Sequence, residues 1–134
     1  MADEKIDAAV NARQSLMRLY VFNIGTLGAM AKGAIDYDAA TASAAAENLR
    51  KLASINQQGF WPQGSSTAEL GDKTRARPEI WSTFPAIMDK VNGLADATTA
   101  LAASAGTLDG LRAGIGGVGK ACGACHKEFR VKRE

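Results

Sequence analysis

Apolar residues recur every three or four positions along most of this chain, and this spacing restricts its fold more than any other feature. Residues spaced in this way lie on one face of an α-helix. In the first segment the series comprises Ile6, Val10, Arg13, Met17, Tyr20, Ile24, Leu27 and Ala31. The pattern therefore predicts one long amphipathic helix with a charged residue, Arg13, on its inner face.

A second helical pattern follows a short break. Gly33 is a suitable stop for the first helix, and Asp38 is a suitable N-cap for the next, whose stripe runs to about Ile55. Residues 57–77 then read QQGFWPQGSSTAELGDKTRAR, with Gly, Pro and Ser and without a sustained period. Such punctuation is typical of loops, so this segment is predicted to be one long connection.

Two more helices are expected in the second half of the chain. Pro78 can open a short turn, and a third helical stripe runs from Ile80 to Leu101 with Pro85 in its first turn. Thr107 is a plausible N-cap for a fourth stripe that ends at Phe129 and carries both cysteines inward. Four helices with mostly short connections favour an all-α protein, an antiparallel four-helix bundle.

Length and charge set further limits. A chain of 134 residues is typical of one domain, so residues 1–134 are expected to form a single unit. The 16 basic and 14 acidic side chains give a net charge of +2, too small for a nucleic-acid-binding surface. No apolar run is long enough to cross a bilayer, and the charged start MADEKIDAAV is not a signal core. We expect no membrane insertion, and an exported form would already have lost its signal peptide.

The segment KACGACHKEF holds both cysteines and the only histidine. On a helix, Cys122 shares a face with Cys125 and His126, because residues three and four apart are neighbours. C-x-x-C-H is the attachment signature of c-type haem: two thioethers fix the haem edge, and the imidazole coordinates iron from the proximal side. The motif predicts one covalent haem c on Cys122 and Cys125, with His126 as the proximal iron ligand.

Three other uses of these residues were weighed. A thioredoxin-like dithiol belongs beside a βαβ pattern, which the sequence lacks. A structural zinc site needs about four ligands, and only three nitrogen or sulfur ligands of the usual kind are present. A disulfide within one helix would cross-link almost nothing. The haem interpretation is therefore favoured over all three.

The fourth helix is rich in glycine, which disfavours a helix by about 1 kcal/mol per residue relative to alanine. Its glycines are Gly110, Gly114, Gly116, Gly117, Gly119 and Gly123. Missing side chains permit close approach to a neighbouring helix or a large ligand, which would offset that cost. The alternative is a loosely ordered loop from Gly114 to Gly119.

Four stretches together resemble the class II c-type cytochromes, in particular the cytochrome c prime family. They are ARQSLM, AKG followed by YDAA, RPEIW, and VGKACGACHKEFR near the end of the chain. The resemblance covers nearly the whole chain. It implies a four-helix bundle with haem partly enclosed near one end, a location in the bacterial periplasm, and frequently a homodimer formed through the first two helices.

The same resemblance implies roles for residues near the haem. Met17 would cover the distal face, either as a packing residue or as a sixth iron ligand, with Met30 and Met88 as the other methionines offered. Arg13 and Gln14 would contact the haem propionates, although Arg13 can also reach water from the bundle end. Arg130, four residues after His126, would line the proximal pocket.

The sequence is compatible with three functions. The first is electron transfer, strictly so if Met17 ligates iron; the second is binding of nitric oxide or carbon monoxide at a five-coordinate iron, with Leu16, Met17 and Tyr20 near the entrance. The third is a haem-free helical interaction module. A basic run can steer an acidic redox partner protein, and it comprises Lys127, Arg130, Lys132 and Arg133. No nucleophile–base pair is evident, so an enzyme is not expected.

Overall fold

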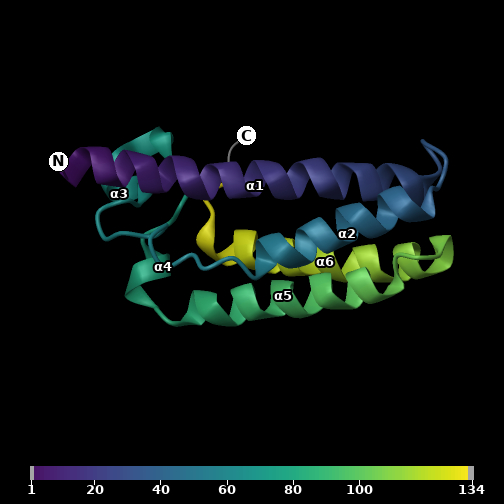
Figure 1. Cartoon of the computed structure of the whole chain (residues 1–134). Helices are drawn as coiled ribbons and strands as arrows, with labels where there is room; N and C mark the ends of the chain where they lie inside the picture. The colour runs from purple at the N-terminus through teal and green to yellow at the C-terminus, as the bar shows by residue number, and fades with distance from the viewer. Residues whose placement is uncertain (1, 133–134) are drawn as a thin grey trace.

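The computed structural model describes residues 2–132, which form an antiparallel four-helix bundle (Figure 1). The bundle consists of α1 (Ala2–Lys32), α2 (Ala39–Ala53), α5 (Ala86–Ser104) and α6 (Leu108–Phe129). Contacts join α1 to α2, α2 to α5, α5 to α6 and α6 to α1, which closes a ring around the core. The predicted fold class is confirmed. Within the described residues, no helix is long and apolar enough to cross a membrane.

Helix ends follow the predicted caps. Gly33, with a φ of 79°, ends α1 in a conformation that side chains disfavour. The Asp38 carboxylate accepts a hydrogen bond of 2.8 Å from the backbone N–H of Thr41 and begins α2. Thr107 caps α6 in the same way through the N–H of Gly110, at 3.0 Å. The observed end of α2 lies two residues before the expected one.

The prediction for the first part of the third helix was wrong. The chain forms α4 (Glu79–Ser82), leaves the helical path and begins α5 only at Ala86. Pro85 stands before that helix, and the residue before a proline is disfavoured in the helical conformation. Phe84 is accordingly 63% exposed and does not extend the buried stripe, whereas Ile80 is buried beside the end of α6.

The long connection is also more ordered than expected. It contains α3 (Thr67–Leu70) and the short 3-10 helix η1 (Gly71–Lys73), and Ser66 with Glu69 forms a capping box at the start of α3. Its last residues pair with the chain after α6: Arg77 N–H donates to the Phe129 carbonyl at 2.9 Å, and Ala76 forms an isolated bridge with Arg130. Residues so far apart in sequence give no periodic signal.

Two apolar clusters stabilise the molecule. The large one fills the bundle, and its fully buried side chains include Leu27, Leu49, Leu101, Leu111 and Val118. Each such leucine contributes about 2 kcal/mol of transfer free energy. The smaller cluster joins Ala76, Ile80, Ile87 and Phe129, with Cys125 packed against it. It anchors the end of α6 to the connection.

The glycines of α6 fall into two groups. A Cβ on Gly110 would lie 1.9 Å from the Ser104 carbonyl oxygen, and one on Gly114 would lie 3.0 Å from Leu101 Cδ1. At the other four glycines an added Cβ meets nothing within 4 Å. Close approach is thus confirmed for Gly110 and Gly114, both against the end of α5. The loose-loop alternative is wrong, because α6 is continuous.

We expect Gly110→Ala to lower the free energy of unfolding by about 2 kcal/mol, because the new methyl group meets rigid backbone. The matched control, Gly116→Ala in the same helix, should raise it by about 1 kcal/mol through helix propensity alone. Urea unfolding of both holoproteins, followed by circular dichroism, measures the difference. Equal effects of the two changes would contradict the packing described here.

Candidate functional site

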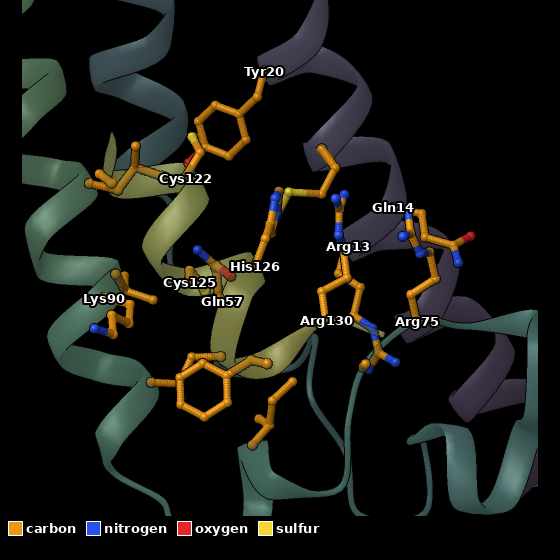
Figure 2. A pocket seen from close by; sticks show the side chains of 18 of the residues that line it. Arg13, Gln14, Tyr20, Gln57, Arg75, Lys90, Cys122, Cys125, His126 and Arg130 are labelled. Atoms are coloured by element: carbon orange, nitrogen blue, oxygen red, sulfur yellow. The ribbon is translucent and has the colours of Figure 1, made fainter. Parts of the chain in front are cut away.

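One cavity of about 460 Å³ lies between α1, α5, α6 and the connection (Figure 2). Its walls include apolar side chains from all three helices, such as Val21 on α1, Val91 on α5 and Phe129 on α6. Most of the site residues predicted from the sequence line it, namely Arg13, Gln14, Met17, Cys122, Cys125, His126 and Arg130. Residues from positions 13 to 130 therefore converge on a single site.

Helix α6 brings Cys122, Cys125 and His126 to one wall of the cavity (Figure 2). Both cysteines are free and half-buried, so the disulfide alternative is wrong. Burial raises the pKa of both thiols, whereas a reactive thioredoxin-like cysteine has a lowered one. Among residues 2–132, no group of three or more His, Cys, Asp or Glu side chains is placed to hold a metal ion.

The surroundings of His126 favour the neutral form of its imidazole. Burial lowers its pKa, and the nearby charges of Arg130 and Arg75 lower it further. The imidazole is therefore neutral at physiological pH, and the neutral ring is the form that ligates a metal. The protein environment thus favours ligation over protonation.

Arg130 reaches the cavity by a different route from the one predicted. The expectation placed it on the same helical face as His126, but α6 ends at Phe129, and Arg130 is the extended C-cap residue. Its backbone is held by the pairing with the connection: Val131 N–H donates to the Arg75 carbonyl at 2.8 Å, and Arg75 Nε donates to the Val131 carbonyl at 2.9 Å. This pairing brings Arg75 and Arg130 to one end of the cavity (Figure 2).

Arg13 is buried and holds the connection in place. Its Nη1 donates to the Phe60 carbonyl at 3.1 Å and to Ser65 Oγ at 2.8 Å. Its Nη2 donates to the Ser65 carbonyl at 2.6 Å and to Thr74 Oγ1 at 3.1 Å. All four terminal N–H groups are therefore used by neutral oxygens, and the alternative in which Arg13 extends into water is wrong. A propionate contact by the remaining Nε–H stays a prediction.

Two tryptophans complete the surroundings of Arg13. The guanidinium carbon lies 4.8 Å from the ring centroid of Trp61 and 6.0 Å from that of Trp81, within the range of cation–π attraction. The two rings are 6.4 Å apart, but only Trp61 lines the cavity. Burial lowers the pKa of Arg13 to about 10, which still leaves it charged at neutral pH.

Only one methionine of the described residues lines the cavity. Met17 does so while 37% exposed, whereas Met30 is buried in the bundle core and Met88 is exposed on α5. Leu16, expected near the entrance, is instead buried in the core and does not line the cavity. Of the three methionines proposed from the sequence, Met17 alone therefore lies at the cavity.

Gln57 and Lys90 are among the polar lining residues that the sequence analysis did not find. Lys90 follows Ile87 by three positions and precedes Val91, so it is a charged member of the α5 stripe in the way that Arg13 is in α1. This spacing could have identified Lys90 as a lining residue from the sequence. Gln57 offered none, because it lies in the connection, where no period exists.

The cavity fits a large planar cofactor with two acidic groups. Its volume lies in the range of cofactor sites, its walls are largely apolar, and both thiols and the imidazole meet there. The Tyr20 hydroxyl lines the cavity and is buried without a hydrogen-bond partner among the described residues. Burial, and then the charge of Cys122, raises its pKa to about 12. A buried hydroxyl group without a hydrogen-bond partner is unusual in a protein core and is consistent with a cofactor site.

Fold and cavity define a class of protein: a helical bundle built to enclose a c-type cofactor. Residues 8–130 match the sequence model of the family described as Cytochrome C'. Since that match spans most of the chain, the protein belongs to the cytochrome c' family. The cofactor of this family is haem c, and the two cysteines needed for its covalent attachment are present.

Individual relatives agree with this assignment. Cytochrome c-554 of Cereibacter sphaeroides is 37% identical over 129 residues, covering 96% of this chain and 84% of that protein. A solved cytochrome c' from Rhodobacter sphaeroides superposes with a TM-score of 0.91 at 35% identity, covering 96% of this chain and 98% of the other. The nitric oxide complex of a cytochrome c prime variant from Alcaligenes xylosoxidans gives 0.83 at 35% identity, covering 96% and 97%.

We expect Arg13→Lys to lower the free energy of unfolding by about 3 kcal/mol, because one ammonium group cannot reproduce four buried hydrogen bonds from a planar fork. Arg18→Lys, an exposed residue of the same helix, is the matched control and should change stability by less than about 0.5 kcal/mol. Urea unfolding of each holoprotein measures both. A loss below 1 kcal/mol at Arg13 would show that its contacts to the connection contribute little.

Proposed function

We propose that this protein is a periplasmic haem c protein that transfers electrons and binds diatomic gases, and that it is not an enzyme. In this proposal Cys122 and Cys125 form the two thioethers, and His126 is the proximal iron ligand. One observation carries it: the two thiols and the imidazole line the same wall of one largely apolar cavity. Residues 1–134 would act as a single domain.

The chain's own residues suit this role. Haem c supplies an iron that changes between ferric and ferrous states and, with one histidine ligand, leaves a position for a gas molecule. His126 is held neutral for ligation by burial and by two neighbouring arginines. The cavity walls are largely apolar, and Met17 lies on the α1 side of it. Arg13 and Gln14 would face the propionates, and Arg130 the proximal side.

Gas binding is supported by a solved relative, which is a nitric oxide complex of a cytochrome c prime variant. Carbon monoxide is a diatomic of similar size and would enter the same site. The competing proposal is a strictly low-spin electron carrier in which Met17 is the sixth iron ligand. It is favoured by the position of Met17 as the one methionine of the described residues that lines the cavity.

The first test uses protein matured with a haem-attachment system. Mass analysis of its peptides should find the haem on the peptide that carries Cys122 and Cys125. Its ferrous spectrum should be high-spin and should respond readily to carbon monoxide, and Met17→Leu, which removes sulfur but keeps the bulk, should leave both properties unchanged. A low-spin spectrum with a sulfur-to-iron band that Met17→Leu abolishes would establish Met17 ligation and electron transfer alone.

The periplasmic location rests on the resemblance to bacterial relatives of the same family. Osmotic shock of the native host should release the protein with other periplasmic proteins. Retention in the spheroplasts would contradict this part of the proposal. The haem-free interaction module has no support beyond the sequence, and a colourless matured protein would be needed to restore it.

A homodimer formed through α1 and α2 is the assembly we propose. The supporting observation is a pair of exposed apolar side chains one turn apart on the same face of α1: Leu19 is 50% exposed and Phe22 73%. Large apolar side chains gathered in this way commonly mark a protein interface. Two such faces can meet around a two-fold axis, where the same patch serves both copies.

We expect Phe22→Glu to weaken the dimer at least tenfold, because each interface would contain two new carboxylates in an apolar contact. Phe84→Glu is the matched control, since Phe84 is 63% exposed but lies in the connection between α4 and α5. Sedimentation equilibrium of the three holoproteins gives their dimer dissociation constants. A wild type that is monomeric at high concentration, or equal effects of both variants, would overturn this assembly.

A further inference from the structure

The permanently charged side chains that line the cavity are basic. Five of its lining residues carry a permanent positive charge, namely Arg13, Arg18, Arg75, Lys90 and Arg130, and no Asp or Glu of the described residues lines it. The whole chain is almost balanced, with 16 basic and 14 acidic side chains. The excess of positive charge is therefore concentrated at the cofactor cavity and is not a property of the surface as a whole.

Part of this charge is already neutralised. Lys90 Nζ lies 3.8 Å from Glu128 Oε2, which offsets its charge, whereas Arg13 keeps its charge but is buried beneath the connection. The two propionates of haem c would offset more of it. At the C-terminal end of the cavity, Arg75 and Arg130 lie together (Figure 2), and the exposed Lys132 follows Arg130 by two residues. We call Arg75, Arg130 and Lys132 the basic lip.

The backbone fixes the basic lip in position. Reciprocal hydrogen bonds between Arg75 and Val131 join the connection to the chain after α6, and Arg77 N–H donates to the Phe129 carbonyl. The lip therefore cannot move without disturbing the segment that carries His126. Its two arginines therefore keep a fixed place at the end of the cavity where His126 lies.

We propose that the basic lip is the docking surface for the acidic face of an electron-transfer protein. This inference rests on the proposed electron-transfer function and names the class of partner. Positive charges around a low-dielectric cleft focus the field, which raises the rate of encounter with an anionic partner and orients it. Docking here would bring the partner to the end of the cavity where the proximal ligand lies, by way of exposed Arg130 and Lys132.

The test follows electron exchange of the holoprotein by stopped flow at several ionic strengths. Hexacyanoferrate(III) and tris(phenanthroline)cobalt(III) are an anionic and a cationic oxidant, and each takes one electron from ferrous haem, leaving it ferric. An acidic ferredoxin of the plant [2Fe–2S] type, which gives one electron to ferric haem, is the protein-sized probe. The variants are Arg75→Gln and Lys132→Gln, with Lys32→Gln at the far end of α1 as the matched control.

The anionic oxidant and the ferredoxin should react on the order of threefold more slowly with each lip variant at low salt, and the difference should vanish at high salt. The cationic oxidant should show the opposite trend, and the control should match the wild type. Lys132→Gln breaks no hydrogen bond of the described structure, so it decides the matter if Arg75→Gln is unstable.

Other outcomes overturn the proposal. Parallel changes with both oxidants would mean that the lip alters the reduction potential and does not guide a partner. Rates that change neither with ionic strength nor with the lip variants would rule out docking at the basic lip but leave the proposed electron-transfer function intact. A holoprotein that exchanges electrons with none of the three probes would instead overturn the proposed electron-transfer function.

Discussion

The guanidinium of Arg13 is the contact on which the cofactor end of the molecule depends. It stands on the inner face of α1, where a charge without partners would be strongly unfavourable. The connection satisfies it with four oxygen acceptors and the face of Trp61. In return, Arg13 fixes a 21-residue segment (57–77) that has little regular structure of its own. That segment supplies Trp61, Thr74, Arg75 and Ala76 to the cavity wall.

The position of the haem motif depends in turn on this contact. The connection, once fixed, pairs with the residues after α6 through Ala76 and Arg130. That pairing and the small apolar cluster hold the end of α6, which carries Cys122, Cys125 and His126. The geometry of the haem motif is therefore set partly by a residue more than a hundred positions earlier. The large apolar cluster stabilises the helices and also reaches the site, because it contains Tyr20 and Cys122 packs against it.

How much of this is readable from the sequence depends on the kind of signal. The four bundle helices and the caps at Asp38 and Thr107 were predicted correctly, because periodicity and capping act over a few residues. The haem c expected from the C-x-x-C-H motif agrees with the family match. The helix expected through Phe84 was wrong because a local break at Pro85 overrides the period. Arg13 was recognised as a charge that needs a partner, but its acceptors lie about 50 to 60 residues away, and no short-range pattern identifies them.

The site shows the same division between local and distant information. Cys122, Cys125 and His126 could be assigned a role from spacing alone, and Arg130 from its closeness to them. Its true position depends on chain pairing beyond the helix, which also brings Arg75 beside it. Two arginines near one imidazole favour its neutral form and, by the same electrostatics, favour the ferrous state of an iron that it ligates, because ferrous iron carries one positive charge fewer. The pairing of two distant segments would thus tune the proximal side of a haem held by His126, through the two arginines that also belong to the basic lip.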